Sequence, residues 1–160
     1  MKQQLAQKKD GFTIIEVVLV LAVAALIMLM VLVAVPAMQR NQRDDQRQRS
    51  VSELKLEIGE YTSRNNGSLP AATNDAWNAF FAEYMRQGGA EFADPRGDEY
   101  SASVSNTVPA TLPAYDEDES VLYIYTGATC NGEDVQAGAG QRRAALVLPL
   151  EGGGRVCQET

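Results

Sequence analysis

The chain has 160 residues, of which 45% are hydrophobic, and carries a formal net charge of −7 at neutral pH. It holds no histidine and only two cysteines, which excludes histidine-based triads, HExxH zinc sites, histidine-ligated haem, four-cysteine zinc sites and iron–sulfur clusters. Neither GxGxxG nor GxxxxGKS/T occurs, and the acidic balance disfavours general nucleic-acid binding.

An uninterrupted apolar run extends from Val17 to Val35, close to the N-terminus. As an α-helix it spans roughly 28 Å, which approaches the roughly 30 Å hydrocarbon thickness of a bilayer. The run is longer than the apolar core of a cleaved secretory signal, which has about 7–15 residues. It therefore predicts a retained transmembrane helix, and the alternative is a buried core helix of a soluble protein.

Charged residues flank the run on both sides and do not set its orientation by the positive-inside rule. They are Lys2, Lys8 and Lys9 before it, and Arg40, Arg43, Arg47 and Arg49 after it.

The two cysteines, Cys130 and Cys157, both follow the run. An even count without a metal-binding pattern predicts one disulfide, which needs an oxidising compartment, and two unpaired thiols are the alternative. A disulfide places the C-terminal part outside the cytoplasm and the N-terminus inside.

The junction ahead of the apolar run reads KKDGFTIIE, from residue 8 to residue 16. Its last residue, Glu16, puts a carboxylate at the start of a hydrophobic helix, where an ionised group is costly and usually has a partner. The expected cation is an α-amino group. Such a group arises on Phe12 only if the chain is cut after Gly11.

This segment, KKDGFTIIEVVLVLAVAAL, resembles the N-terminus of a type IV prepilin. The shared features are a short basic leader ending in glycine, then phenylalanine, then glutamate as the fifth mature residue, and an unbroken apolar helix. The resemblance implies that a prepilin peptidase cuts the Gly11–Phe12 bond and methylates the Phe12 amine. It also implies that Glu16 is the assembly carboxylate. Pseudopilins are close relatives of this family.

The resemblance implies an α+β fold, in which a long hydrophobic N-terminal spine helix packs on a small antiparallel β-sheet head. On this basis residues 1–11 are the leader peptide and 12–37 the transmembrane or filament-core half of the spine. Residues 38–66 form its polar and then amphipathic half. Residues 67–160 form a globular head with a C-terminal β region closed by the disulfide.

A physical argument for Glu16 stands beside the resemblance. In a filament core without water or lipid, an unpaired charge is expensive, whereas opposite charges on neighbouring copies offset one another. Glu16 of an incoming copy facing the Phe12 amine of the previous one would fix their axial register. The alternative is that Glu16 reaches the lipid headgroups from the membrane edge.

The helix is expected to continue beyond the membrane, with a kink at Pro36, because proline removes one backbone donor and crowds the preceding turn. The segment from Gln39 to Arg49 is wholly polar and predicts a solvated helix, with Arg–Asp pairing across subunits as the alternative. An apolar stripe at helical spacing follows, and Asn65–Gly67 predicts the helix end. The stripe consists of Val51, Leu54, Ile58 and Tyr61, with Leu56 off it.

The remaining sequence predicts one short helix, a turn and several strands. The helix is Asp75–Gln87, the turn is Asp94–Gly97, and the strands are Tyr100–Val104, Val121–Thr126, Ala144–Leu150 and Arg155–Cys157. Pro149 suggests that its strand lies at a sheet edge. The acidic run from Asp116 to Glu119 is interpreted as a solvated loop, with a calcium site as the alternative. No cofactor, other metal site or catalytic residue is predicted.

The function implied by the resemblance is that of a structural pilin subunit, stored in the cytoplasmic membrane and polymerised into a surface filament for adhesion, twitching motility or DNA uptake. A pseudopilin of a secretion or competence system is the first alternative. A monomeric membrane-anchored binding domain or enzyme is the second. Implied partners are further copies of the chain, the prepilin peptidase, an assembly platform with motor ATPases, and host or partner cell surfaces. DNA contact would need a local patch such as Arg142–Arg143.

Overall fold

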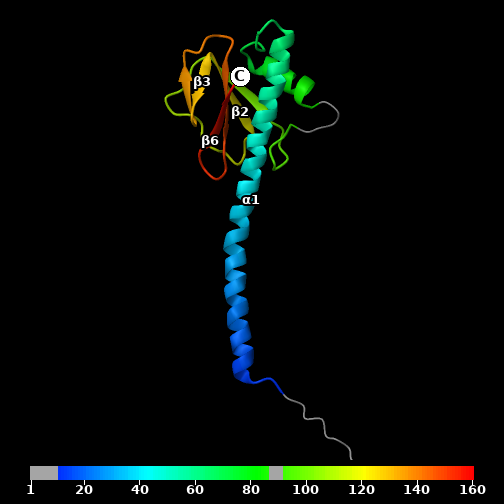
Figure 1. Ribbon diagram of the computed structural model, residues 1–160, viewed down its shortest axis with the longest axis vertical. Helices are drawn as coiled ribbons and strands as arrows, with labels where there is room; N and C mark the ends of the chain where they lie inside the picture. The colour runs from blue at the N-terminus through cyan, green and yellow to red at the C-terminus, as the bar shows by residue number, and fades with distance from the viewer. Residues whose placement is uncertain (1–10, 87–91) are drawn as a thin grey trace, which may run out of the picture. The chain divides into compact units, whose positions relative to one another are not determined.

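The computed structural model of the protein describes residues 11–86 and 92–160 (Figure 1). Most of the predicted leader, 1–10, lies outside the described residues. The described chain divides into two compact units, one ending at Gln39 and the other running from Arg40 to Thr160, called here the head unit. The elements of the described chain are α1 (Ile14–Arg64), α2 (Asn74–Phe80), η1 (Phe81–Met85), β1 (Ser101–Ser105), β2 (Val121–Thr126), β3 (Ala128–Asn131), β4 (Asp134–Ala137), β5 (Ala144–Pro149) and β6 (Arg155–Glu159).

The N-terminal part of α1, up to Gln39, is an exposed apolar helix. Its large hydrophobic side chains are 41–85% exposed from Ile14 to Val35, and no described residue covers them. By length and composition α1 is able to cross a membrane. The long N-terminal apolar helix of the sequence prediction is thus confirmed.

The part of α1 in the head unit has a single buried apolar stripe. Val51, Leu54 and Ile58 are fully buried, whereas Leu56 is 71% exposed. The spacing of three and four residues places the first three on one side of the helix and Leu56 on another. The predicted stripe is confirmed.

The end of α1 is built by a left-handed turn. Asn66 and Gly67 have φ angles of 56° and 76°, a conformation that asparagine and glycine tolerate best. The amide of Gly67 donates to the carbonyl of Thr62 at 2.8 Å and satisfies a carbonyl at the helix end. This agrees with the stop predicted at Asn65–Gly67.

The predicted second helix is present as two pieces, α2 and the π-helical segment η1. Thr73 begins it, because its hydroxyl accepts from the amide of Ala76. Trp77, Phe80 and Phe81 are buried in the same core as the α1 stripe. The predicted end of this helix, Gln87, lies outside the described residues.

The main sheet has the strand order β1-β2-β5-β6 and is mixed. Strands β2, β5 and β6 are antiparallel, but β1 pairs with β2 in parallel, from Ser101 opposite Val121 to Ser105 opposite Tyr125. The expected small sheet in an α+β fold is thus present, and its antiparallel pairing holds for β2, β5 and β6 but not for β1. A long connection, residues 106–120, returns the chain to the end at which β1 begins, which a tight hairpin turn does not do.

The expectation that Pro149 marks an edge strand is wrong. Strand β5 lies between β2 and β6 and is buried along its whole length. Pro149 is its last residue and pairs with Arg155. At the strand terminus the missing proline N–H removes no donor from the middle of the ladder, so the central position is tolerated.

The two faces of the sheet have different covers. Leu122, Ile124, Leu146 and Leu148 join the core formed with α1 and α2. The alternate residues, such as Tyr125 and Val147, join a second cluster with residues of the β3–β4 hairpin. The sequence reasoning did not predict this hairpin.

Candidate functional site

The start of α1 is a capping box centred on Thr13 and Glu16. The Glu16 carboxylate accepts from the Thr13 backbone N–H at 2.8 Å and from its hydroxyl at 2.7 Å, and the Glu16 amide donates to the Thr13 hydroxyl at 3.3 Å. This reciprocal arrangement is the one that Thr-x-x-Glu favours at a helix N-terminus, because it satisfies two amides that lack helical partners. Glu16 therefore has a local partner within its own chain.

Gly11 and Phe12 lie just ahead of the helix, outside regular secondary structure. The Phe12 side chain is 89% exposed. A Cβ added at Gly11 would meet no atom within 4 Å. Phe12, Glu16, Val17 and Val20 border one surface hollow, so the phenylalanine and the carboxylate face the same side of the helix start. Gly11 and Phe12 are thus both exposed residues in an irregular segment.

The sequence reasoning singled out Glu16 but missed the role of Thr13. The signal was present, since threonine three residues before glutamate at the start of an apolar run is the capping-box pattern. The pattern accounts for the fold of the helix start. Glutamine would complete the capping box equally well. The pattern therefore does not explain why this chain has a glutamate beside the apolar run.

Pro36 lies within α1, and the helix assignment continues on both sides of it. The lost N–H is the one that would reach residue 32. A kink at Pro36 stays a prediction.

The head unit contains the disulfide between Cys130 and Cys157, whose Cα atoms are 5.7 Å apart. Cys130 lies on β3 and Cys157 on β6. The bond therefore joins the β3–β4 hairpin to the last strand of the main sheet. Since the hairpin packs on one face of that sheet, the disulfide fixes the hairpin to strand β6.

A second polar constellation, which the sequence reasoning missed, surrounds Arg47. Its guanidinium is 1% exposed and holds Asp94 in a bidentate pair, with Nε–Oδ2 at 2.6 Å and Nη2–Oδ1 at 2.9 Å. Nη1 also donates to Asp44 at 2.8 Å and lies 3.5 Å from a Glu151 oxygen. We call Arg43, Asp44, Arg47, Asp94 and Glu151 the Arg47 cluster.

The interpretation of Gln39–Arg49 as a solvated helix is therefore wrong for one side of the helix. Asp44 and Arg47 are buried, while Asp45, Gln46 and Gln48 between and beside them are exposed. The buried pair continues the phase of the apolar stripe that begins at Val51, at spacings of three and four residues. That shared phase is the signal that could have found it.

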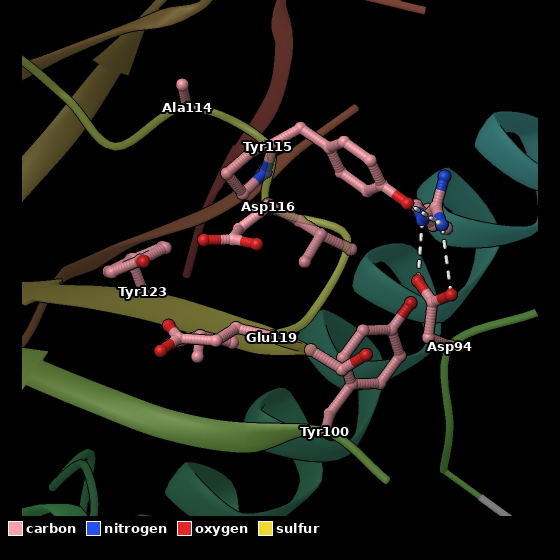
Figure 2. Close-up of a pocket in the computed structure, with 12 residues that line it drawn as sticks. Asp94, Tyr100, Ala114, Tyr115, Asp116, Glu119 and Tyr123 are labelled. Atoms are coloured by element: carbon pink, nitrogen blue, oxygen red, sulfur yellow. Dashed lines mark hydrogen bonds and ion pairs between the residues drawn. The ribbon is translucent and has the colours of Figure 1, made fainter. Parts of the chain in front are cut away.

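Two side chains approach the Arg47 guanidinium from different loops. Asp94 lies in the turn before β1, and Tyr115 lies in the connection before β2 (Figure 2). The Tyr115 hydroxyl is 3.3 Å from Nη2, and the guanidinium carbon is 4.9 Å from the ring centroid. Arg96 also pairs with Asp94, at 3.1 Å. The charge of Arg47 is thus met on several sides without access to bulk water.

Two carboxylates of the cluster, Asp94 and Glu151, have lowered pKa values, which favours their ionised form. Burial alone would raise the pKa of Asp94, but the hydrogen bonds from Arg47 and from the Arg96 backbone outweigh it, and the pKa lies below its ordinary value. The hydrogen bond from Arg43 lowers the pKa of Glu151 against a smaller effect of burial. Arg47 keeps a raised pKa, because hydrogen bonds to Asp94 and Asp44 outweigh its burial.

A cavity of about 20 Å³ lies beside the cluster, bordered by Tyr100, Tyr115 and Glu119 among others (Figure 2). It has room for about one water molecule and not for an organic ligand. Across the ranges 11–86 and 92–160, no group of three or more Asp, Glu, Cys or His side chains is arranged to hold a metal ion. The cluster joins α1 to two loops of the head unit, so we interpret it as a structural site.

Residues 7–32 match the family described as the Prokaryotic N-terminal methylation motif. This motif is the class III signal of type IV pilins and pseudopilins, and it contains Gly11, Phe12, Thr13 and Glu16. It implies polymerisation and processing by a prepilin peptidase, and it points to a structural subunit. The match ends before the head unit. No curated protein and no protein of known structure matches the chain significantly.

Proposed function

We propose that this chain is a type IV pilin, cut after Gly11, N-methylated at Phe12 and polymerised into a surface filament. One observation carries the proposal. The methylation motif leads directly into a helix whose apolar side chains are exposed and uncovered by any described part of the chain. A surface of that size needs lipid before assembly and other copies of the helix afterwards.

Processing at the proposed bond is a hydrolysis that changes the charge of the helix start. Water adds across the Gly11–Phe12 amide, which leaves a carboxylate on Gly11 and an ammonium group on Phe12. The Phe12 amine then lies near the first turn of α1. After N-methylation it keeps its positive charge and remains a hydrogen-bond donor.

Glu16 then has two available partners, which act at different stages. In a single chain its carboxylate is held by the Thr13 amide and hydroxyl. In a filament core, the ammonium group of an adjacent copy offers a full opposite charge, which an amide does not. We infer that assembly is favoured when this charge becomes the partner of Glu16, which fixes the axial register of the two copies.

A pair of Glu16 variants separates the two roles. Glu16→Gln keeps a side-chain oxygen for the capping box, because glutamine also serves there, but it removes the negative charge. We expect both Glu16→Gln and Glu16→Ala to insert in the membrane and to lose most filament assembly, measured by shearing and microscopy of surface filaments. Thr13→Val removes the hydroxyl of the cap and should keep most assembly.

If Glu16 acts only as a helix cap, the same variants should give different results. Glu16→Gln would then assemble normally and Thr13→Val would be impaired. Normal filaments from Glu16→Ala would remove Glu16 from assembly altogether.

A pseudopilin of a secretion or competence system is the second candidate, because pseudopilins carry the same methylation motif. Microscopy separates the two: long surface fibres composed of this chain support a pilus, and short cell-envelope assemblies support a pseudopilus. A monomeric membrane-anchored domain would instead keep residues 1–11 when exposed to a prepilin peptidase.

The proposed cellular path follows from the same features. The N-terminus is inside and the head unit outside a single-pass cytoplasmic membrane, which agrees with a disulfide in the head. Extraction into the filament would require an assembly platform and motor ATPases. Adhesion to host or partner cells and twitching motility are the proposed activities of the filament. DNA uptake would depend on a local contact such as Arg142–Arg143.

A further inference from the structure

We propose that the Arg47 cluster is an ionic latch that holds residues 40–50 of α1 on the head, independently of the apolar core that holds residues 51–64. This inference does not rest on the proposed function. It assigns a conformational device to the head unit, with a defined closed state and a defined open segment.

No apolar side chain of residues 40–50 packs this part of α1 on the head. From Gln39 to Ser50 the sequence contains no hydrophobic residue. The α1 residues of the apolar core begin at Val51. The buried residues of α1 before Val51 are Asp44 and Arg47, both charged. The attachment of these turns to the head therefore depends on polar contacts.

A reciprocal set of hydrogen bonds joins α1 to the turn after β5. Asp44 on the helix accepts from the backbone amides of Glu151 and Gly152, at 2.9 and 2.8 Å. Arg43 on the helix donates in return to both oxygens of Glu151, at 2.7 and 2.5 Å. Each side supplies donors and acceptors, so the contact specifies one rotation and one axial position of the helix.

The bidentate pair between Arg47 and Asp94 joins α1 to the turn before β1. Asp94 also accepts from the Arg96 backbone at 3.1 Å. A planar guanidinium fits a carboxylate in this way only in a narrow range of orientations. The latch thus connects two loops, remote from each other in the sequence, to a single helical turn.

The latch differs from the apolar core in how it fails. Removal of an apolar side chain leaves a cavity, whereas removal of one partner from a buried ion pair leaves an uncompensated charge. That charge reaches water if residues 40–50 detach, and the sheet does not have to unfold. Opening therefore moves the first buried residue of α1 from Asp44 to Val51, as a local transition.

The test is amide hydrogen exchange of the full chain in detergent micelles, with the disulfide intact. Arg47→Met removes the charge and keeps a long side chain. We expect amides of residues 40–50 to exchange about tenfold faster or more, while residues 51–64 and strand β5 keep wild-type rates. The matched control is Arg64→Met, which breaks an exposed pair with Glu60 on the same helix. We expect no change in either segment.

A milder variant guards against general misfolding. If Arg47→Met loses native far-UV circular dichroism, Glu151→Gln decides, because it removes one charge and leaves the amide contacts to Asp44 in place. It should accelerate exchange in the same segment by a smaller factor. Equal acceleration in residues 40–50 and 51–64, or unchanged rates in 40–50 for a folded variant, would overturn the latch.

Discussion

Helix α1 is exposed along its N-terminal part and packed along its C-terminal part, and its sequence changes character accordingly. Leu26 and Leu29 are 63% and 65% exposed, whereas Leu54 is fully buried. The N-terminal part is apolar on every side, and the C-terminal part has one apolar stripe. An all-round apolar surface needs an apolar surrounding such as lipid or other chains, and a stripe needs one partner within the chain.

The charged residues of the two parts follow the same division. Arg47 is buried and meets its opposite charges within the chain. Glu16 is exposed, and among the described residues it accepts hydrogen bonds from the amide and hydroxyl of Thr13, which carry no full charge. The partners of Arg47 therefore explain a feature of the fold, whereas Glu16 keeps the capacity to pair with a cation of another copy.

The largest expected difference between a buried and an exposed position of α1 is between two leucines in its C-terminal part. Leu54→Ala removes a fully buried side chain and should lower the free energy of unfolding by about 3–5 kcal/mol. Leu56→Ala, at 71% exposure, should change it by less than about 0.5 kcal/mol. Chemical denaturation followed by tryptophan fluorescence reports both, since Trp77 lies in the same core. Similar costs for the two variants would contradict the single-stripe description.

Removal of the disulfide comes next in expected size. Replacing Cys130 and Cys157 by serine frees a loop with a sequence separation of 27 and should cost about 3–4 kcal/mol. The effect should be confined to the head unit, because both cysteines lie there. Helical circular dichroism from the N-terminal part should persist in micelles after the head has unfolded. Loss of both signals in one transition would contradict the division of α1.

The smallest predicted effect is a dependence of head stability on pH. Asp94 and Glu151 have pKa values below their ordinary ones. Their contribution is complete above the unfolded carboxyl range of about 4 and is lost as pH falls through the folded pKa. The guanidinium groups of Arg43 and Arg47, which pair with these carboxylates, have raised pKa values and stay charged throughout this range.

The Tm of the head should therefore be level between about pH 5 and 7 and should fall below about pH 4. Arg47→Met should show a shallower fall, since Asp94 loses the main donor that lowers its pKa. A Tm that rises on acidification from pH 5 to 3 would contradict the assignment.

The parts of the fold that depend on local pattern could be predicted from the sequence. The apolar run, the stripe from Val51 to Tyr61 and the turn at Asn66–Gly67 each follow from spacing or from backbone preference. The strand Val121–Thr126 was also recognised with the bounds of β2. Each of these signals lies within one short continuous stretch of the chain.

The parts that depend on distant partners could not be predicted. Arg47 is 47 residues from Asp94, and Arg43 is 108 residues from Glu151. Because these partners are so distant in the sequence, the pattern of Gln39–Arg49 predicts a solvated helix. The β3–β4 hairpin has short and largely exposed strands with little apolar alternation. The parallel pairing of β1 with β2 depends on the path of the connection, which composition does not specify.

We propose that this chain is processed at Gly11 and then assembles through its exposed helix. Mass spectrometry of the N-terminal peptide from purified surface filaments is the decisive test of this proposal. We expect a chain that begins with N-methylated Phe12. Filaments that contain the chain with residues 1–11 still attached, or filaments that lack the chain, would contradict it.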